Sequence, residues 1–159
     1  MTLIYRIGDL CDAPEPIIIH GCNAQGVMGS GVARAIRYKW PHVFDKYQRK
    51  YVKQGGLNLG QIVWANVEPY KFIGNAITQE NYGRTGTRYV DYDAVSKVFA
   101  EVYAALSNLC EMDLIPYDLE PAVAIPKIGA GLGGGDWDII SYRIMVEMRH
   151  RDVIVYELE

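Results

Sequence analysis

The chain has 159 residues, half of them hydrophobic, which suits one domain over residues 1–159 with a single core. Its formal net charge of -3, with both signs interspersed, argues against a surface dedicated to polyanions. The N-terminus has no charged stretch followed by an apolar one, and no run approaches the roughly 20 apolar residues of a membrane span. We therefore expect a soluble cytoplasmic protein without a membrane partner.

The cysteines and histidines show no metal-binding pattern. The cysteines are odd in number and lack the Cys-x-x-Cys spacing of metal and redox sites, and the histidines are scattered. These residues are Cys11, Cys22, Cys110, His20, His42 and His150. We expect reduced thiols, no metal site and no cofactor.

Two strands are predicted before the first glycine-rich loop. Leu3 to Ile7 alternates weakly and is typical of a short edge strand, which delivers Asp9 to a turn. Ile17 to Cys22 is apolar, rich in β-branched residues and bounded by a proline and Gly21, which indicates a strand buried on both faces. This strand leads into a glycine-rich loop from Gly21 to Val32.

Two helices follow that loop. Apolar residues recur at helical spacing from Gly31 to Trp40, and Pro41 opens a second helix that ends at Gly55. The basic residues along the second helix are Lys46, Arg49, Lys50 and Lys53. A nucleic-acid face and an ordinary solvated surface both fit this pattern, and the second is favoured in an acidic protein.

The middle of the chain predicts a hairpin and a long helix. Gly60 to Val67 and Tyr70 to Thr78 are strands joined by a short turn, and Asn75 to Arg88 then forms a polar loop. One apolar face persists from Asp91 through Cys110, so Asp91 is expected to open a helix there.

The last third of the chain contains the second glycine-rich loop. Ile115 to Glu120 is a predicted linker, and Ala122 to Pro126 is a buried strand. Five glycines then fall within the seven residues from Gly129 to Gly135, before a helix that begins at Trp137. Val153 to Tyr156 closes the chain as a strand.

Strands that alternate with helices predict an α/β sandwich with a mixed, largely parallel sheet and ligands at the carboxyl ends of its strands. Both glycine-rich loops follow strands at such ends. Glycine lets backbone N–H groups approach a phosphate closely, and the following helix offers its positive end. A pyrophosphate would occupy both loops better than a lone phosphate would, so we expect a nucleotide diphosphate. Neither loop is a P-loop or a dinucleotide fingerprint, so we do not expect nucleoside triphosphate hydrolysis or hydride transfer.

In order and spacing these motifs resemble the macro domain family, ADP-ribose-binding modules with a three-layer α/β/α fold, over nearly the whole chain. The resemblance implies that Asp9, in Gly8-Asp9-Leu10, binds the adenine amino group and that Asn23 meets the distal ribose. The segment 29–33 resembles the first phosphate loop and 129–133 the second. The implied ligand residues are Asp9, Leu10, Asn23, Gly29, Ser30, Gly31, Val32, Gly129, Ala130, Gly131, Leu132 and Gly133.

Two catalytic subgroups of that family resemble different parts of the chain. His20 to Gly26 reproduces the His-x-Cys-Asn-x-x-Gly signature of yeast-type ADP-ribose 1''-phosphate phosphatases. Gly129 to Trp137 resembles the subgroup that removes ADP-ribose from DNA bases or acidic side chains, but that subgroup has a catalytic lysine where Gln79 follows Thr78 here. A glutamine amide is neither nucleophile nor base at neutral pH, so the phosphatase is favoured. A pure ADP-ribose reader without catalysis stays open.

Three residues are candidates for the chemistry. His20 could protonate the leaving ribose oxygen or orient water, or it could be a buried strand residue that hydrogen-bonds a carbonyl. Asp136 could activate water or orient the ribose, or it could cap the helix that begins at Trp137. Asn23, within the signature, is the third candidate. Asp91 has the same ambiguity as Asp136.

Two further residues of the loops have alternative interpretations. Tyr82 could stack on or cover a ribose, or it could pack on the surface. Cys22 is interpreted as a small buried strand residue, because no Cys-x5-Arg phosphate loop surrounds it.

The leading hypothesis is a phosphatase that hydrolyses ADP-ribose 1''-phosphate to ADP-ribose and phosphate, with the loop N–H groups stabilising the phosphoryl charge. The expected partner is a small nucleotide ligand, ADP-ribose or its 1''-phosphate. An ADP-ribosylated macromolecule is the alternative partner.

Overall fold

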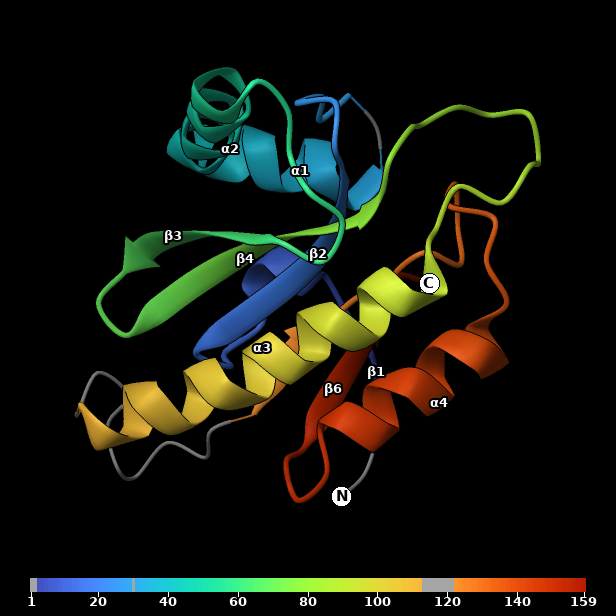
Figure 1. Cartoon of the computed structure of the whole chain (residues 1–159). Coiled ribbons are helices and arrows are strands. Elements are labelled where there is room, and N and C mark those ends of the chain that lie inside the picture. The colour runs from blue at the N-terminus through green and yellow to red at the C-terminus, as the bar shows by residue number, and fades with distance from the viewer. Residues whose placement is uncertain (1–2, 30, 113–121) are drawn as a thin grey trace.

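The computed structural model describes residues 3–29, 31–112 and 122–159, and a six-stranded sheet forms its centre (Figure 1). The strand order is β1-β6-β5-β2-β4-β3, and neighbours are parallel except for β3 and β4, which form an antiparallel hairpin at one edge. The strands are β1 (Leu3–Ile7), β2 (Ile17–Asn23), β3 (Ile62–Glu68), β4 (Lys71–Gln79), β5 (Val123–Ile125) and β6 (Val153–Glu157). The predicted mixed, largely parallel sheet is confirmed, and β1 is an edge strand as expected.

Helices cover both faces of the sheet, which gives the expected α/β/α layers (Figure 1). One face carries α1 and α2, and the other carries α3 and α4, which pack against each other. The helices are η1 (Leu10–Asp12, a short 3-10 helix), α1 (Gly31–Lys39), α2 (Pro41–Gln54), α3 (Tyr92–Glu111) and α4 (Trp137–Glu147). The predicted starts at Gly31, Pro41 and Trp137 are confirmed. Asp91 caps α3, because its carboxylate accepts from the N–H of Ala94 at 2.9 Å.

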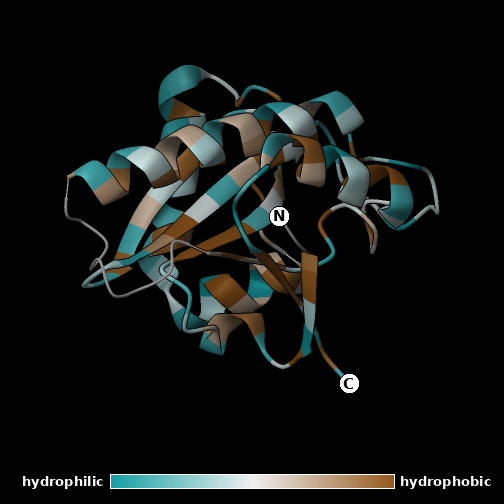
Figure 2. Cartoon of the chain, turned by 90° about the horizontal axis from the view of Figure 1, so that it is seen from below, coloured by the Kyte–Doolittle hydropathy of each residue, from teal (hydrophilic) through white to brown (hydrophobic). Residues whose placement is uncertain are grey.

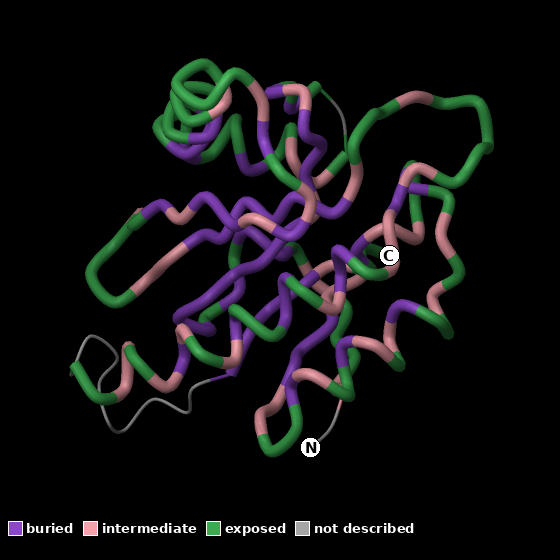
Figure 3. Tube along the Cα trace, viewed as in Figure 1, coloured by how far each residue is buried: buried purple, intermediate pink, exposed green. Residues whose placement is uncertain are grey.

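β2 is buried on both faces, as its apolar sequence predicts. Ile17 and Ile19 pack against the α3 and α4 layer, Ile18 packs against the α1 and α2 layer, and none of the three has exposed surface. Hydrophobic residues follow the strands between the helices (Figure 2), and the buried part of the chain coincides with the central strands (Figure 3). Each isoleucine contributes about 1.5–3 kcal/mol on burial, so β2 is a firm base for the loop that follows it.

Several element boundaries differ from the predictions. β3 and β4 are shifted by one or two residues, and Asn75 to Gln79 belong to β4, so the predicted polar loop begins only after Gln79. β2 continues to Asn23, after a shift in its register against β4 between Cys22 and Asn23. β5 contains only Val123–Ile125, because the chain turns away toward the second glycine-rich loop from Pro126. The predicted linker, Ile115 to Glu120, lies outside the described residues.

Candidate functional site

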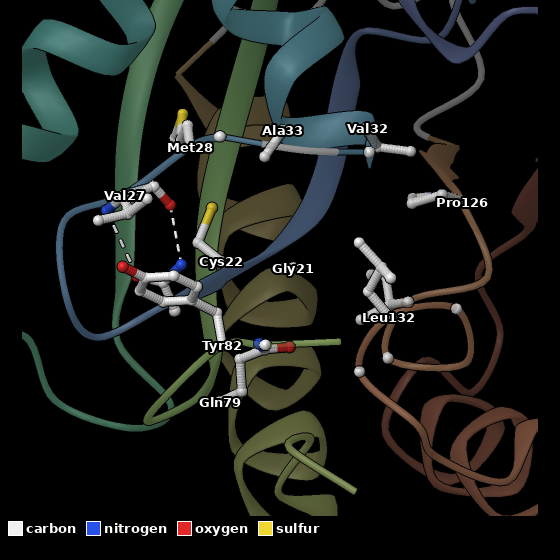
Figure 4. A pocket seen from close by; sticks show the side chains of 18 of the residues that line it. Gly21, Cys22, Val27, Met28, Val32, Ala33, Gln79, Tyr82, Pro126 and Leu132 are labelled. Atoms are coloured by element: carbon white, nitrogen blue, oxygen red, sulfur yellow. Dashed lines mark hydrogen bonds between the residues drawn. The ribbon is translucent and has the colours of Figure 1, made fainter. Parts of the chain in front are cut away.

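A cavity of about 550 Å³ opens at the carboxyl ends of β2, β4 and β5, where a parallel sheet is expected to hold a ligand. Both glycine-rich loops and the segment after β4 line it. In Figure 4, Tyr82 and Gln79 lie on one side and Leu132 and Pro126 on the other, with Gly21 between them. The predicted ligand residues that line the cavity are Asn23, Gly29, Gly31, Val32, Tyr82, Gly129, Gly131, Leu132 and Gly133.

The first glycine-rich loop presents the amino end of α1 to the cavity. The N–H groups of Gly31, Val32 and Ala33 lie in the first turn of α1, where a helix provides no acceptor for them. All three residues line the cavity. Partial positive charge at this helix end favours an anion there. Ser30, the remaining predicted member of this loop, lies outside the described residues.

The second glycine-rich loop is folded by its own backbone hydrogen bonds. The N–H of Gly135 donates to the Gly129 carbonyl at 2.7 Å. Gly129 has a φ of +75°, and a Cβ there would lie 2.5 Å from Cγ2 of Val90, so this turn requires glycine. The loop N–H groups without an acceptor in the described part of the chain are those of Gly129, Gly131, Leu132 and Gly133. They are therefore available to an anionic ligand.

Gly21 forms the floor of the cavity, and a buried hydroxyl lies directly beneath it. A Cβ at Gly21 would lie 2.8 Å from Oγ1 of Thr78 and 3.2 Å from Cγ2 of Ile128. Thr78 has no exposed surface, and its hydroxyl has no hydrogen-bond partner among residues 3–29, 31–112 and 122–159. A ligand or water that reaches the floor can therefore satisfy this hydroxyl, which would otherwise be costly to bury.

Asn23 lines the cavity at the end of β2, and its side-chain amide is held by the loop that follows. Nδ2 donates to the carbonyl of Val27 at 2.8 Å, and Oδ1 accepts from the N–H of Gln25 at 3.0 Å. The side chain is thus fixed and its oxygen is occupied. Asn23 can offer a ligand an N–H donor more readily than an acceptor.

His20 lies beneath the floor of the cavity and does not line it. Its side chain is fully buried, and Nε2 pairs with Oδ1 of Asn75 at 2.6 Å. Burial lowers the pKa of His20 to about 4, although the Asn75 hydrogen bond opposes the shift. The imidazole is neutral at pH 7, so this geometry does not support the proton-donor role considered for it. The alternative interpretation, a buried strand residue, fits, although its partner is the Asn75 amide rather than a backbone carbonyl.

Cys22 does line the cavity, but it is not an activated nucleophile. Its thiol is buried beside the neutral His20 ring, with Sγ 3.6 Å from Nε2. Burial raises the pKa of the thiol above its usual range, so the thiolate is not formed at neutral pH. The interpretation of Cys22 as a small buried strand residue is confirmed.

Asp136 caps α4 and does not line the cavity. Its Oδ1 accepts from the N–H of Asp138 at 2.8 Å, and its own N–H donates to the Tyr92 hydroxyl at 3.0 Å. The helix-cap interpretation is therefore confirmed. A ligand role for the same carboxylate has no support in this geometry.

Three predicted ligand residues lie outside the cavity lining: Asp9, Leu10 and Ala130. Asp9 is exposed and caps η1, while the Leu10 side chain belongs to the core. In the turn before Asp9, the N–H of Gly8 donates to the carbonyl of Glu157 at 2.8 Å. The Glu157 carboxylate in turn lies 3.3 Å from Nζ of Lys127, which lines the cavity. Glu157 thus connects the turn before Asp9 to Lys127, while Asp9 itself stays outside the lining.

Arg84 and Lys127 line the cavity although no sequence motif marks them. Lys127 stands between β5 and the second glycine-rich loop, which is the only sequence signal for it. Arg84 follows Tyr82 in a polar loop whose path cannot be predicted from local pattern. Gln79, at the end of β4, also lines the cavity, and its Nε2 donates to the Asn81 carbonyl at 2.7 Å.

Two kinds of feature are missing from the described residues. Within those ranges no three histidine, cysteine, aspartate or glutamate side chains are grouped closely enough to hold a metal ion. No helix that the structure describes is long and apolar enough to cross a membrane.

The fold and this cavity define an α/β/α domain with two backbone loops whose N–H groups suit an anionic ligand. Residues 19–144 match the family model described as Macro domain. The chain belongs to the macro domain family.

Proteins with names from both catalytic subgroups are similar to this chain. A 17.5 kDa protein of Enterobacteria phage T4 is 29% identical over all of this chain and 98% of its own length. A DNA ADP-ribosyl glycohydrolase of Mycobacterium tuberculosis is 26% identical over 97% of this chain. The match covers 42% of the length of that protein. An ADP-ribose 1''-phosphate phosphatase of Candida albicans is 27% identical over 84% of this chain and 86% of its own. Among solved structures, a macrodomain protein of Streptomyces coelicolor has a TM-score of 0.78 and 26% identity, covering 99% of this chain and all of that one.

Because His20 is buried and neutral, we expect the free energy of unfolding to depend on pH. Above pH 6.5 the imidazole is neutral in the folded and unfolded chain, so its contribution to stability is complete. As pH falls toward 4, the unfolded chain takes up a proton that the folded chain excludes, so stability falls, by about 3 kcal/mol in total. Denaturant unfolding at several pH values measures this loss.

The variant His20→Gln is the control, because carboxylates titrate in the same range in both proteins. The difference in unfolding free energy between wild type and variant should shrink steadily from pH 6.5 to pH 4. A difference that does not change with pH would contradict the burial of a neutral His20.

Proposed function

We propose that this cavity binds ADP-ribose. The observation that carries the proposal is that two loops from distant parts of the chain line one cavity, and that both have backbone N–H groups without an acceptor. Such donors suit the two phosphates of a diphosphate, one loop for each. The proposed orientation has adenine beyond Lys127, toward Asp9, and the distal ribose at Asn23 and Tyr82. Relatives named for ADP-ribose chemistry support the choice of ligand.

We further propose that the reaction is the hydrolysis of ADP-ribose 1''-phosphate. In this reaction water attacks phosphorus, the bond from phosphorus to the ribose 1'' oxygen breaks, and the leaving oxygen takes a proton. Gln79 supports this reaction over the lysine-dependent removal of ADP-ribose from DNA or protein, because its amide cannot attack an anomeric carbon. Arg84 lines the same end as Tyr82 and can compensate the additional charge of a 1''-phosphate.

The proposed catalysis relies on binding and electrostatics rather than on acid and base groups. The described lining contains no carboxylate, and His20 is neutral and buried below it. Backbone N–H groups and Arg84 are then the groups that can stabilise charge developing on the phosphoryl oxygens. We expect slow turnover for this reason. The same observation is what favours the alternative, a reader that binds ADP-ribose without reaction.

A side-by-side assay tests the proposed reaction. Purified protein is offered ADP-ribose 1''-phosphate, an ADP-ribosylated oligonucleotide and an ADP-ribosylated protein, and free phosphate and ADP-ribose are measured. The expected result is phosphate release from the first substrate, inhibited by ADP-ribose, with no release from the other two. Release of ADP-ribose from the oligonucleotide without phosphate release would assign the other reaction. Binding without any turnover would make the protein a reader.

Replacement of Asp9 tests the orientation of the ligand. Asp9→Ala should weaken ADP-ribose binding roughly 10- to 100-fold in calorimetry, because it removes a charged acceptor for the adenine amino group. Asp9→Ser should lose as much ADP-ribose affinity as Asp9→Ala, although its serine can still cap η1. Asp12→Ala, in the same turn but paired with Lys39, is the matched control and should bind normally. Unchanged affinity in both Asp9 variants would remove Asp9 from the adenine site.

A further inference from the structure

Tyr47 reaches the ligand cavity indirectly, from the middle of α2. Its side chain has no exposed surface and is packed among Cys22, Met28, Phe44 and other apolar residues of the α2 side of the sheet. The hydroxyl lies 2.5 Å from the carbonyl oxygen of Asn23 and 3.1 Å from Oδ1 of the same residue. A single phenolic proton thus serves both oxygens of the one residue.

The Asn23 amide has one orientation that satisfies its surroundings. Oδ1 faces the hydroxyl of Tyr47 and the N–H groups of Gln25 and Val27, while Nδ2 donates to the carbonyl of Val27. The dashed lines beside Val27 in Figure 4 are the two bonds between Val27 and Asn23. A flipped amide would turn its NH₂ group against three donors. The second hydrogen of Nδ2 is then the part of the amide without a partner in the described ranges.

We propose that Tyr47 is a positioning residue for the ligand, which fixes Asn23 at the end of β2 as an N–H donor to an oxygen of the distal ribose. This inference rests on ADP-ribose as the ligand. The fixed donor selects a sugar that offers a hydroxyl oxygen as acceptor at that point. It also rules out Asn23 Oδ1 as the group that accepts a proton from water, since that oxygen already accepts from its neighbours.

The environment of Tyr47 keeps its hydroxyl a donor. Burial raises the pKa of the phenol above its usual range, so the proton stays in place at any working pH. The neighbouring ring, Phe44, lies 6.4 Å away between centroids, and the ring of Tyr47 fills the space between α2 and β2. Loss of the hydroxyl alone therefore leaves the packing in place but removes the restraint that α2 places on the carbonyl and side chain of Asn23.

The variant Tyr47→Phe tests this role by calorimetry with two ligands, ADP-ribose and ADP. Because ADP has no distal ribose, its binding does not use the Asn23 amide. We expect the affinity for ADP-ribose to fall about 5- to 10-fold and the affinity for ADP to stay the same. Tyr51→Phe is the matched control, one helical turn further along α2, and should bind both ligands as wild type does.

Asn23→Ala provides the second half of the experiment. With the amide removed, adding Tyr47→Phe should cause no further loss of ADP-ribose affinity, because the two residues act through one contact. Equal losses for ADP and ADP-ribose would show a general packing role and overturn the inference, as would full affinity of Tyr47→Phe for ADP-ribose. Failure of the wild-type protein to bind ADP-ribose would instead overturn the proposed function.

Discussion

The candidate site depends on the burial of β2 between β5 and β4, with both of its faces covered by helices. This packing fixes the carboxyl end of the strand, so Gly21 and Asn23 lie at constant positions on the floor of the cavity. The neighbouring strands β4 and β5 end at the same edge and deliver Gln79 and the second glycine-rich loop to it. Loops that begin from such a rigid edge can hold backbone N–H groups ready for a ligand at little cost in conformational entropy.

The arrangement explains why the chemistry of the cavity is dominated by the backbone. The two carboxylates that the sequence offered for catalysis, Asp91 and Asp136, cap α3 and α4. The buried imidazole of His20 pairs with Asn75 and joins β2 to β4 rather than reaching a ligand. The polar groups that line the cavity are backbone N–H groups, the uncharged side chains of Asn23, Gln79 and Tyr82, and two cations, Arg84 and Lys127. Such a set recognises anions well and moves protons poorly.

Much of the fold could be predicted from local sequence, but less of the site. The run of β-branched residues in β2 and the prolines and glycines at its borders are local signals, and so are the helix starts at Gly31 and Trp137. Burial depth is not local: the signature around His20 matches a phosphatase pattern, yet the strand carries this side chain beneath the floor. The constraint on Asn23 is also non-local, since Tyr47 is 24 residues away in sequence. No pattern in either segment connects them.

The central claim is that both glycine-rich loops hold one diphosphate. A crystal structure of the protein with ADP-ribose tests it most directly. The account predicts that the two phosphates lie within hydrogen-bond distance of the N–H groups of Gly31 or Val32 on one side and of Gly131 to Gly133 on the other. The distal ribose should then accept from Nδ2 of Asn23. A nucleotide bound outside this cavity, or one whose phosphates contact only one of the loops, would contradict the account.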